Sequence, residues 1–135
     1  MKLIFDIEAD NLLDDVTQVW CIVARDVDTN EVHTFDPDNI EEGIRLLDKA
    51  DMLIGHNIIE YDLRVLDKLH GYKYTGQTLD TLVYSRTIWP DIREVDIKLH
   101  KQDKMPLALI GRQSLKAWGY RLGELKGDFN SGSES

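Results

Sequence analysis

The chain has 135 residues, 42% of them hydrophobic, and a formal net charge of −9. This length suits one domain with one core, and the acidic balance excludes a protein that binds nucleic acid through a broad basic surface alone. Its one cysteine, Cys21, excludes a disulfide within the chain and favours a reducing compartment, so we expect a cytoplasmic protein. No apolar run approaches the roughly 20 residues of a membrane span, so no membrane association is expected.

Three segments at the start of the chain have the pattern of strands. Residues 3–8 and 17–25 are apolar runs rich in β-branched side chains. A turn at residues 28–30 then leads to residues 31–35, which alternate polar with apolar or β-branched side chains. The sequence therefore predicts three antiparallel strands at the start of the fold.

Helices alternate with a strand over the next part of the chain. A helix is predicted over residues 40–50, and residues 51–55 form a short apolar run whose preceding helix allows a parallel pairing. A second helix is predicted over residues 59–69, and a third begins at Asp80 or Thr81, one of which caps it, and ends before Pro90. This order predicts an α/β fold in which helices cover a mixed sheet.

The last third of the chain is less regular. Residues 92–106 are charged and irregular and are predicted to form a loop, whereas residues 114–122 resume a helical pattern. Residues 127–135 have the composition of a disordered end. We expect one domain over residues 1–129 and a disordered tail over residues 130–135.

Two acidic clusters are candidates for a metal site. Asp6 and Glu8 project from one face of the first strand because side chains alternate along a strand. Asp62 follows Asn57 in a segment that leaves the short strand and enters a helix. Carboxylate oxygens suit magnesium, which takes a few of them together with waters and phosphate oxygens. Each cluster alone is weak, since a solvated strand face or an ordinary first-turn acid explains it equally well.

The order of four segments resembles the 3′-to-5′ exonuclease domain of family A DNA polymerases, especially those of short-tailed phages. Residues 5–10 (Phe-Asp-Ile-Glu-Ala-Asp) are similar to the first exonuclease motif, and residues 56–62 are similar to the second. Residues 79–86 and 114–124 are also similar to segments of the phage polymerases, in matching order. Four ordered matches are far more specific than any one of them.

This resemblance implies a fold, a chemistry and a set of site residues. The fold would be RNase H-like. The activity would be proofreading, in which two Mg²⁺ or Mn²⁺ ions catalyse hydrolysis of the terminal phosphodiester at a single-stranded or frayed 3′ end of DNA. Asp6, Glu8 and Asp62 would be the catalytic metal ligands. Ala9, Leu12 and Asn57 would bind the substrate. The alternatives are a core position for Leu12 and a turn or cap role for Asn57.

The third motif of the family is missing from these 135 residues. It would supply a last carboxylate as Tyr-x-x-x-Asp, yet no tyrosine of the chain has an aspartate four residues later, and Tyr120 reaches Glu124 instead. The chain is therefore expected to be C-terminally incomplete and to depend on the polymerase domain or a complementing polypeptide. An excised fragment, a split gene product and a relative that lost catalysis all fit this pattern.

Two other functions compete with the exonuclease. The first is a non-catalytic module of the same fold that docks on a polymerase or regulates it, with Trp118 and Tyr120 as candidate contacts. The second is a magnesium phosphatase that uses Asp-x-Asp chemistry. The set of Asp6, Glu8 and Asp62 favours a nuclease over both.

Overall fold

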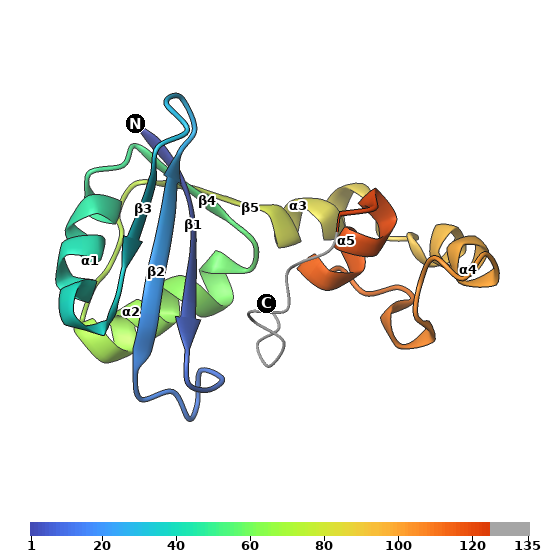
Figure 1. The fold of residues 1–135 in the computed structure, drawn as a ribbon, viewed down its shortest axis with the longest axis horizontal. Coiled ribbons are helices and arrows are strands. Elements are labelled where there is room, and N and C mark those ends of the chain that lie inside the picture. Colours follow the sequence, from blue (N-terminus) through green and yellow to red (C-terminus); the bar gives the residue numbers. More distant parts are fainter. Residues whose placement is uncertain (125–135) are drawn as a thin grey trace. The chain divides into compact units, whose positions relative to one another are not determined.

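A computed structural model describes residues 1–124 of the chain. The chain divides into two compact units, Met1–Thr81 and Leu82–Ser135, which are drawn in Figure 1. The first unit holds the sheet and all the candidate site residues. The tail predicted over residues 130–135 lies outside the described residues.

The sheet of the first unit has five strands in the order β3-β2-β1-β4-β5. β1 (Lys2–Ala9), β2 (Val19–Asp26) and β3 (Val32–Phe35) pair antiparallel, while β4 (Met52–Gly55) and β5 (Gln77–Asp80) join in parallel. The antiparallel start and the parallel β4 confirm the prediction. β5 was not predicted, because three of its four residues are polar and its only buried residue, Asp80, is charged.

Two helices and the sheet enclose the core of the first unit (Figure 1). α1 (Ile40–Asp48) follows a short 3-10 turn (Pro37–Asn39), and α2 (Leu63–His70) ends at Gly71, which adopts a left-handed backbone. Both helices confirm the predicted ones. The buried side chains include alternate residues of β1 and residues of both helices: Leu3, Phe5, Ile7, Ile44, Leu47, Val65 and Leu66. Full burial of such a side chain stabilises the fold by roughly 1.5–3 kcal/mol, so the core fixes which face of β1 points away from the helices.

The second unit is helical where the structure describes it. It contains α3 (Thr81–Ile88, whose first residue ends the first unit), α4 (Arg93–Lys101), a 3-10 turn (Leu107–Leu109) and α5 (Leu115–Leu122). α3 and α5 confirm predicted helices. None of the helices in the described part of the chain is long and apolar enough to cross a membrane.

The prediction of a loop over residues 92–106 is wrong, since α4 occupies much of this segment. The buried residue of this helix is a charged one, Asp96, so the helix lacks the apolar period that sequence reasoning relies on. A weaker signal was present in the charges. Acids lie in the first turn and basic residues in the last, an arrangement that the helix dipole favours.

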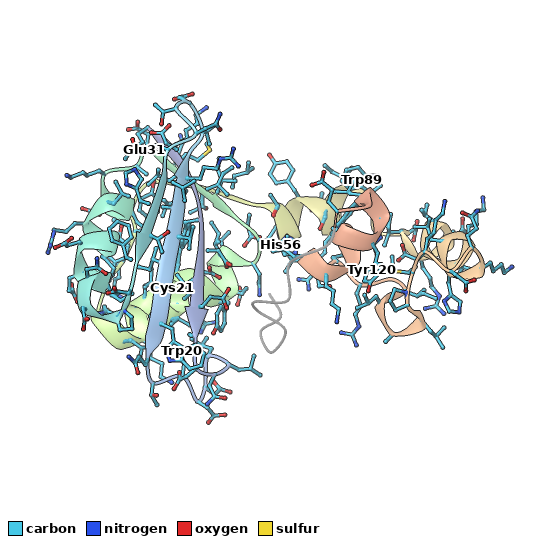
Figure 2. All side chains as sticks on the ribbon, viewed as in Figure 1. Trp20, Cys21, Glu31, His56, Trp89 and Tyr120 are labelled. Carbon is cyan, nitrogen blue, oxygen red and sulfur yellow. The ribbon has the colours of Figure 1, made fainter. Side chains whose placement is uncertain are left out.

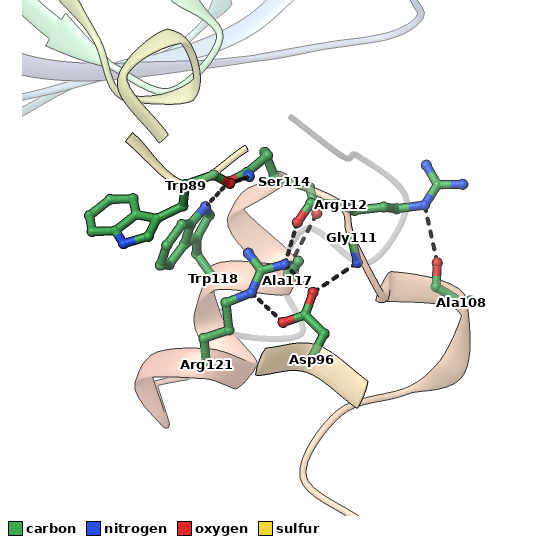
Figure 3. A network of polar contacts seen from close by, with 10 residues as sticks. Trp89, Asp96, Ala108, Gly111, Arg112, Ser114, Ala117, Trp118 and Arg121 are labelled. Carbon is green, nitrogen blue, oxygen red and sulfur yellow. Dashed lines mark hydrogen bonds and ion pairs between the residues drawn. The ribbon is translucent and has the colours of Figure 1, made fainter. Parts of the chain in front are cut away.

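A buried ion pair links α4 to α5 within the second unit (Figure 3). Arg121 donates to both carboxylate oxygens of Asp96, at 2.7 and 2.6 Å, and its guanidinium carbon lies 4.7 Å from the centre of the Trp118 ring. Trp89 packs against Trp118 with ring centres 5.2 Å apart. Trp118 and Tyr120 are half-buried, and the apolar cluster against which Tyr120 packs is small: Met105, Leu109 and Ala117.

Candidate metal site

Asp6 and Glu8 lie on the face of β1 opposite to its core residues. In the register with β2, Asp6 is beside Val23 and Glu8 is beside Cys21, which Figure 2 labels. Partial burial and then the negative charges of Glu8 and Asp6 raise the pKa of the Cys21 thiol. The structure thus places both carboxylates on one surface, as the strand period predicted.

The turn between β4 and α2 brings the second acidic cluster against β1. A side chain at Gly55 would meet the Phe5 carbonyl oxygen at 2.8 Å and Ile58 Cγ2 at 2.4 Å, so only glycine allows this approach. Asn57 then adopts a left-handed backbone with φ of 62°. A π-helical turn (Ile58–Asp62) follows, closed by a bond from the Leu63 N–H to the Ile58 carbonyl, and such turns are frequent at functional sites.

Asp62 ends this turn with its carboxyl almost fully buried, at 1% exposure. Its Oδ2 accepts a hydrogen bond from the Ile7 N–H at 3.1 Å, whereas its Oδ1 is buried and has no hydrogen-bond partner. Burial, followed by the negative charge of Asp6, raises the pKa of Asp62 well above its usual range. A buried carboxyl oxygen without a donor, next to a second carboxylate, fits a divalent cation.

The hydroxyl of Tyr61 lies in the electrostatic field of the same acids. Burial and the negative charges of four carboxylates raise the pKa of its hydroxyl, and these are Asp62, Glu8, Asp10 and Asp6 in order of effect. The side chains of residues 1–124 nevertheless include no ready-made group of three acids, histidines or cysteines that could hold a metal ion. Magnesium usually takes one or two carboxylates and completes its shell with water and substrate phosphate, so the Asp6 and Asp62 pair still fits.

A loop after β1 carries Leu12 into solvent. Asp10 closes this loop by accepting bonds from the Thr17 N–H and hydroxyl and from the Gln18 N–H. The bonds from Thr17 and then from Gln18 lower the pKa of Asp10 to about 2. Lys68 of α2 holds the loop from the other side through the carbonyl oxygens of residues 13 and 14. Leu12 is 74% exposed, so its alternative assignment to the core is wrong.

The other two substrate-binding candidates lie near these acids in the chain. Ala9 is half-buried at the end of β1, where the register with β2 shifts, and it packs against the core. Asn57 is half-buried in the left-handed turn, so its assignment as a turn residue is confirmed. The backbone N–H of Asn57, rather than its side chain, donates a hydrogen bond to Asp80.

Asp80 has a role that sequence reasoning missed. It was predicted mainly as a cap of the helix that follows it, α3, but its carboxylate accepts bonds from the N–H groups of Asn57 and Ile59, at 2.8 and 3.0 Å. Asp80 therefore caps the turn that leads to Asp62. The position of Asp80 at the end of β5 could have indicated this role. Because β5 itself was not predicted, the sequence did not indicate that Asp80 lies beside Asn57.

Comparisons with known proteins agree with the resemblance drawn from the motifs. The DNA-directed DNA polymerase of Enterobacteria phage T3 is 34% identical to the chain over 138 residues, which cover 94% of the chain and 20% of the polymerase. The DNA-directed DNA polymerase of Escherichia phage T7 is 33% identical over 138 residues, which again cover 94% of the chain and 20% of the polymerase. No protein-family model matches the sequence.

A solved structure gives a weaker likeness. The family B DNA polymerase of the archaeon Pyrobaculum calidifontis matches 59% of the chain and 15% of its own chain, at 15% identity and a TM-score of 0.43. The phage matches are the informative ones, and in them the chain spans about one fifth of the length of its relatives. The chain is thus similar, over nearly its whole length, to a segment of about that size in the T3 and T7 phage DNA polymerases.

Proposed function

We propose that the chain is the 3′-to-5′ proofreading exonuclease segment of a phage-type DNA polymerase, with an RNase H-like fold. One observation supports this most directly. The buried Asp62 carboxyl keeps one oxygen without a donor and lies within electrostatic reach of Asp6. A structural carboxylate would use both oxygens in hydrogen bonds, whereas a metal ligand leaves one for the ion.

Asp6, Glu8 and Asp62 would hold one Mg²⁺ or Mn²⁺ ion, and a second in the complete site. Such ions activate water and stabilise the leaving oxygen in phosphodiester hydrolysis. The protein contributes rigid positions. β1 carries Asp6 and Glu8 on a segment that is paired with β2, and the Ile7 N–H fixes the rotamer of Asp62. Rigid placement matters because small displacements of ligands cost large factors in rate.

The substrate would be a single-stranded or frayed 3′ end of DNA. Leu12, exposed on a loop held by Asp10 and Lys68, would pack against the terminal base, and Ala9 and Asn57 would contact the sugar and phosphate. The net charge of −9 opposes binding of DNA by the metal-free protein. Bound cations offset this charge, so substrate binding is expected to depend on metal.

The last carboxylate would come from a polypeptide outside residues 1–135, either the polymerase domain or a complementing chain. This part of the proposal follows from the absence of Tyr-x-x-x-Asp in the sequence and from the share of the phage polymerases that the chain matches. The missing tyrosine would position the attacking water. The chain alone should then hydrolyse DNA slowly.

A single-turnover digestion of a 5′-labelled single-stranded oligonucleotide tests this function. With Mn²⁺ and a downstream polypeptide that carries Tyr-x-x-x-Asp, we expect stepwise shortening from the 3′ end, and a rate lower by roughly a hundredfold or more without that polypeptide. The double variant Asp6→Ala with Glu8→Ala should abolish shortening. Its control is Glu41→Ala with Glu42→Ala, which removes the same charge from α1 on the other side of the sheet. No shortening by the completed wild-type protein would refute the proposal.

A further inference from the structure

The end of β5 holds the turn that carries the candidate metal ligand Asp62. Asp80 pairs with Gly55 in the parallel register of β5 and β4, and it is 4% exposed. Its two carboxylate oxygens accept separate backbone bonds, Oδ1 from the Asn57 N–H and Oδ2 from the Ile59 N–H. Both oxygens are therefore directed at the turn.

Thr81 extends this attachment by one residue. Its hydroxyl oxygen lies 2.9 Å from His56 Nδ1, and the hydroxyl donates to the Gly55 carbonyl at 3.2 Å. His56 is labelled in Figure 2 in the turn after β4. The last residue of β5 and the first residue of α3 thus bond to the backbone and to a side chain of the neighbouring turn.

The turn has reason to need this support. Asn57 adopts a left-handed backbone, which asparagine tolerates better than most residues but less readily than glycine, and a π-helical turn follows it. The first N–H groups of a helical segment also lack partners within the segment. Asp80 satisfies two of them, at residues 57 and 59, and the chain then reaches Asp62 within one turn.

We propose that Asp80, assisted by Thr81, is a positioning residue for metal binding: it sets the conformation of the Asn57–Ile59 turn that presents the Asp62 carboxyl beside Asp6. This inference rests on the proposed metal site and adds to it a residue that does not touch the ion. Residues that orient metal ligands commonly change metal affinity by about 10- to 100-fold when they are replaced.

Calorimetric titration of residues 1–135 in the metal-free state with MnCl₂ tests the inference. Asp80→Asn keeps one acceptor and removes the charge, whereas Asp80→Glu keeps the charge and displaces both acceptors. Both variants should bind Mn²⁺ about 10- to 100-fold more weakly than the wild type. The matched control is Asp36→Ala, since Asp36 caps the 3-10 turn before α1 by accepting a bond from the Asp38 N–H at 3.0 Å. This control should lower the melting temperature without changing Mn²⁺ affinity.

Each outcome decides between the alternatives. Wild-type affinity in both Asp80 variants would overturn the inference and leave the proposed function intact. Weak Mn²⁺ binding by Asp80→Asn together with wild-type binding by Asp80→Glu would show that only the charge of Asp80 matters. Equally weakened binding by Asp36→Ala would show that the effect follows from lower stability. Either outcome overturns the inference. Absence of Mn²⁺ binding in the wild type would refute the proposed metal site and this inference with it. If circular dichroism shows either Asp80 variant unfolded, Thr81→Val takes its place, with weaker Mn²⁺ binding expected and unchanged binding contradicting the inference.

Discussion

The Asp62 carboxyl is bonded to the backbone of β1, with its Oδ2 3.1 Å from the Ile7 nitrogen. Ile7 lies between Asp6 and Glu8, so this bond brings the second acidic cluster against the first. β4 pairs with β1 only as far as Ile4, and the chain beyond β4 turns away into the Asn57 turn. Ile7 pairs with Ile22 of β2, and on the other edge of β1 the side chain of Asp62 takes the place of a strand partner.

The burial of Asp62 predicts an unusual dependence of stability on pH in the metal-free chain. Because the folded pKa is raised above 3.8, the folded state keeps a proton that the unfolded state has released. The stability that this group contributes is therefore full at low pH and is lost as pH rises through the folded pKa. Asp62→Asn should raise the melting temperature by a few degrees near pH 7, or on the order of 1 kcal/mol, and by less near pH 4.

Melting curves in EDTA, followed by circular dichroism at several pH values, measure this difference. Asp14→Asn, an exposed acid in the loop after β1, makes the same charge change and should leave the melting temperature nearly unchanged at every pH. A gain for Asp62→Asn that shrinks as the pH rises would contradict the raised pKa of Asp62.

Breaking the buried ion pair in the second unit should strongly destabilise that unit. Asp96→Ala would leave the Arg121 guanidinium, whose side chain is 4% exposed, buried without its counter-charge. The expected loss is about 3–5 kcal/mol in the unfolding transition of the second unit, followed by tryptophan fluorescence in a urea titration. Asp67→Ala breaks an exposed pair with Lys73 and should cost less than about 1 kcal/mol. Equal losses in the two variants would show that burial of the first pair has no consequence.

The loop that carries Leu12 depends on Asp10 in its ionised form. The pKa of Asp10 is lowered to about 2, so the contribution of this group to loop order is present above its usual pKa and is lost as pH falls through about 2. A carboxyl NMR titration should find this low value in the wild type. Thr17→Val removes the hydroxyl that bonds the carboxylate, so the pKa of Asp10 should rise toward 3.8 in that variant. An unchanged value would contradict the assigned hydrogen bond.

Leu12 offers a test of substrate contact that is separate from folding. Because the side chain is 74% exposed, Leu12→Ala should change the free energy of unfolding by no more than about 0.5 kcal/mol. It should weaken binding of a nuclease-resistant single-stranded oligonucleotide by about 1 kcal/mol, or roughly fivefold, in a fluorescence anisotropy titration with Mn²⁺. Leu107→Ala, which alters a leucine in the second unit that is 70% exposed, should leave binding unchanged. Equal affinity of the wild type and Leu12→Ala would remove Leu12 from the proposed site.

The sequence predicted those parts of the fold that local periodicity determines. The period of two in β1 placed Asp6 and Glu8 on one face, and helical spacing found α1, α2 and α5. The cap residue and Pro90 found α3. It missed β5 and α4 because their buried positions, Asp80 and Asp96, are charged and are satisfied by partners far along the chain. A charged residue reads as exposed in any pattern of hydrophobicity, so the sequence gives no sign of its burial.

The sequence allowed the residues of the candidate site to be named, but it did not predict how their side chains are buried and arranged. Asp62 was recognised as an acid entering a helix, for which exposure is the ordinary expectation. Its burial arises from the left-handed Asn57 and the π-helical turn, neither of which has a reliable sequence signal. The position of Asp80 beside this turn depends on the pairing of β4 with β5, which only the assembled sheet provides.

The location of bound Mn²⁺ in the intact chain tests the central claim most directly. Mn²⁺ broadens the NMR signals of nearby nuclei, so substoichiometric MnCl₂ should broaden the amide signals of Ile7, Glu8 and Asp62 first. The turn between β2 and β3, which includes Asp28 and Glu31, is an acidic region at the far end of β2, and its signals should broaden only at higher MnCl₂. The double variant Asp6→Ala with Glu8→Ala should lose the selective broadening. Broadening that begins at the β2–β3 turn, or that persists unchanged in the double variant, would contradict a metal site formed by Asp6, Glu8 and Asp62.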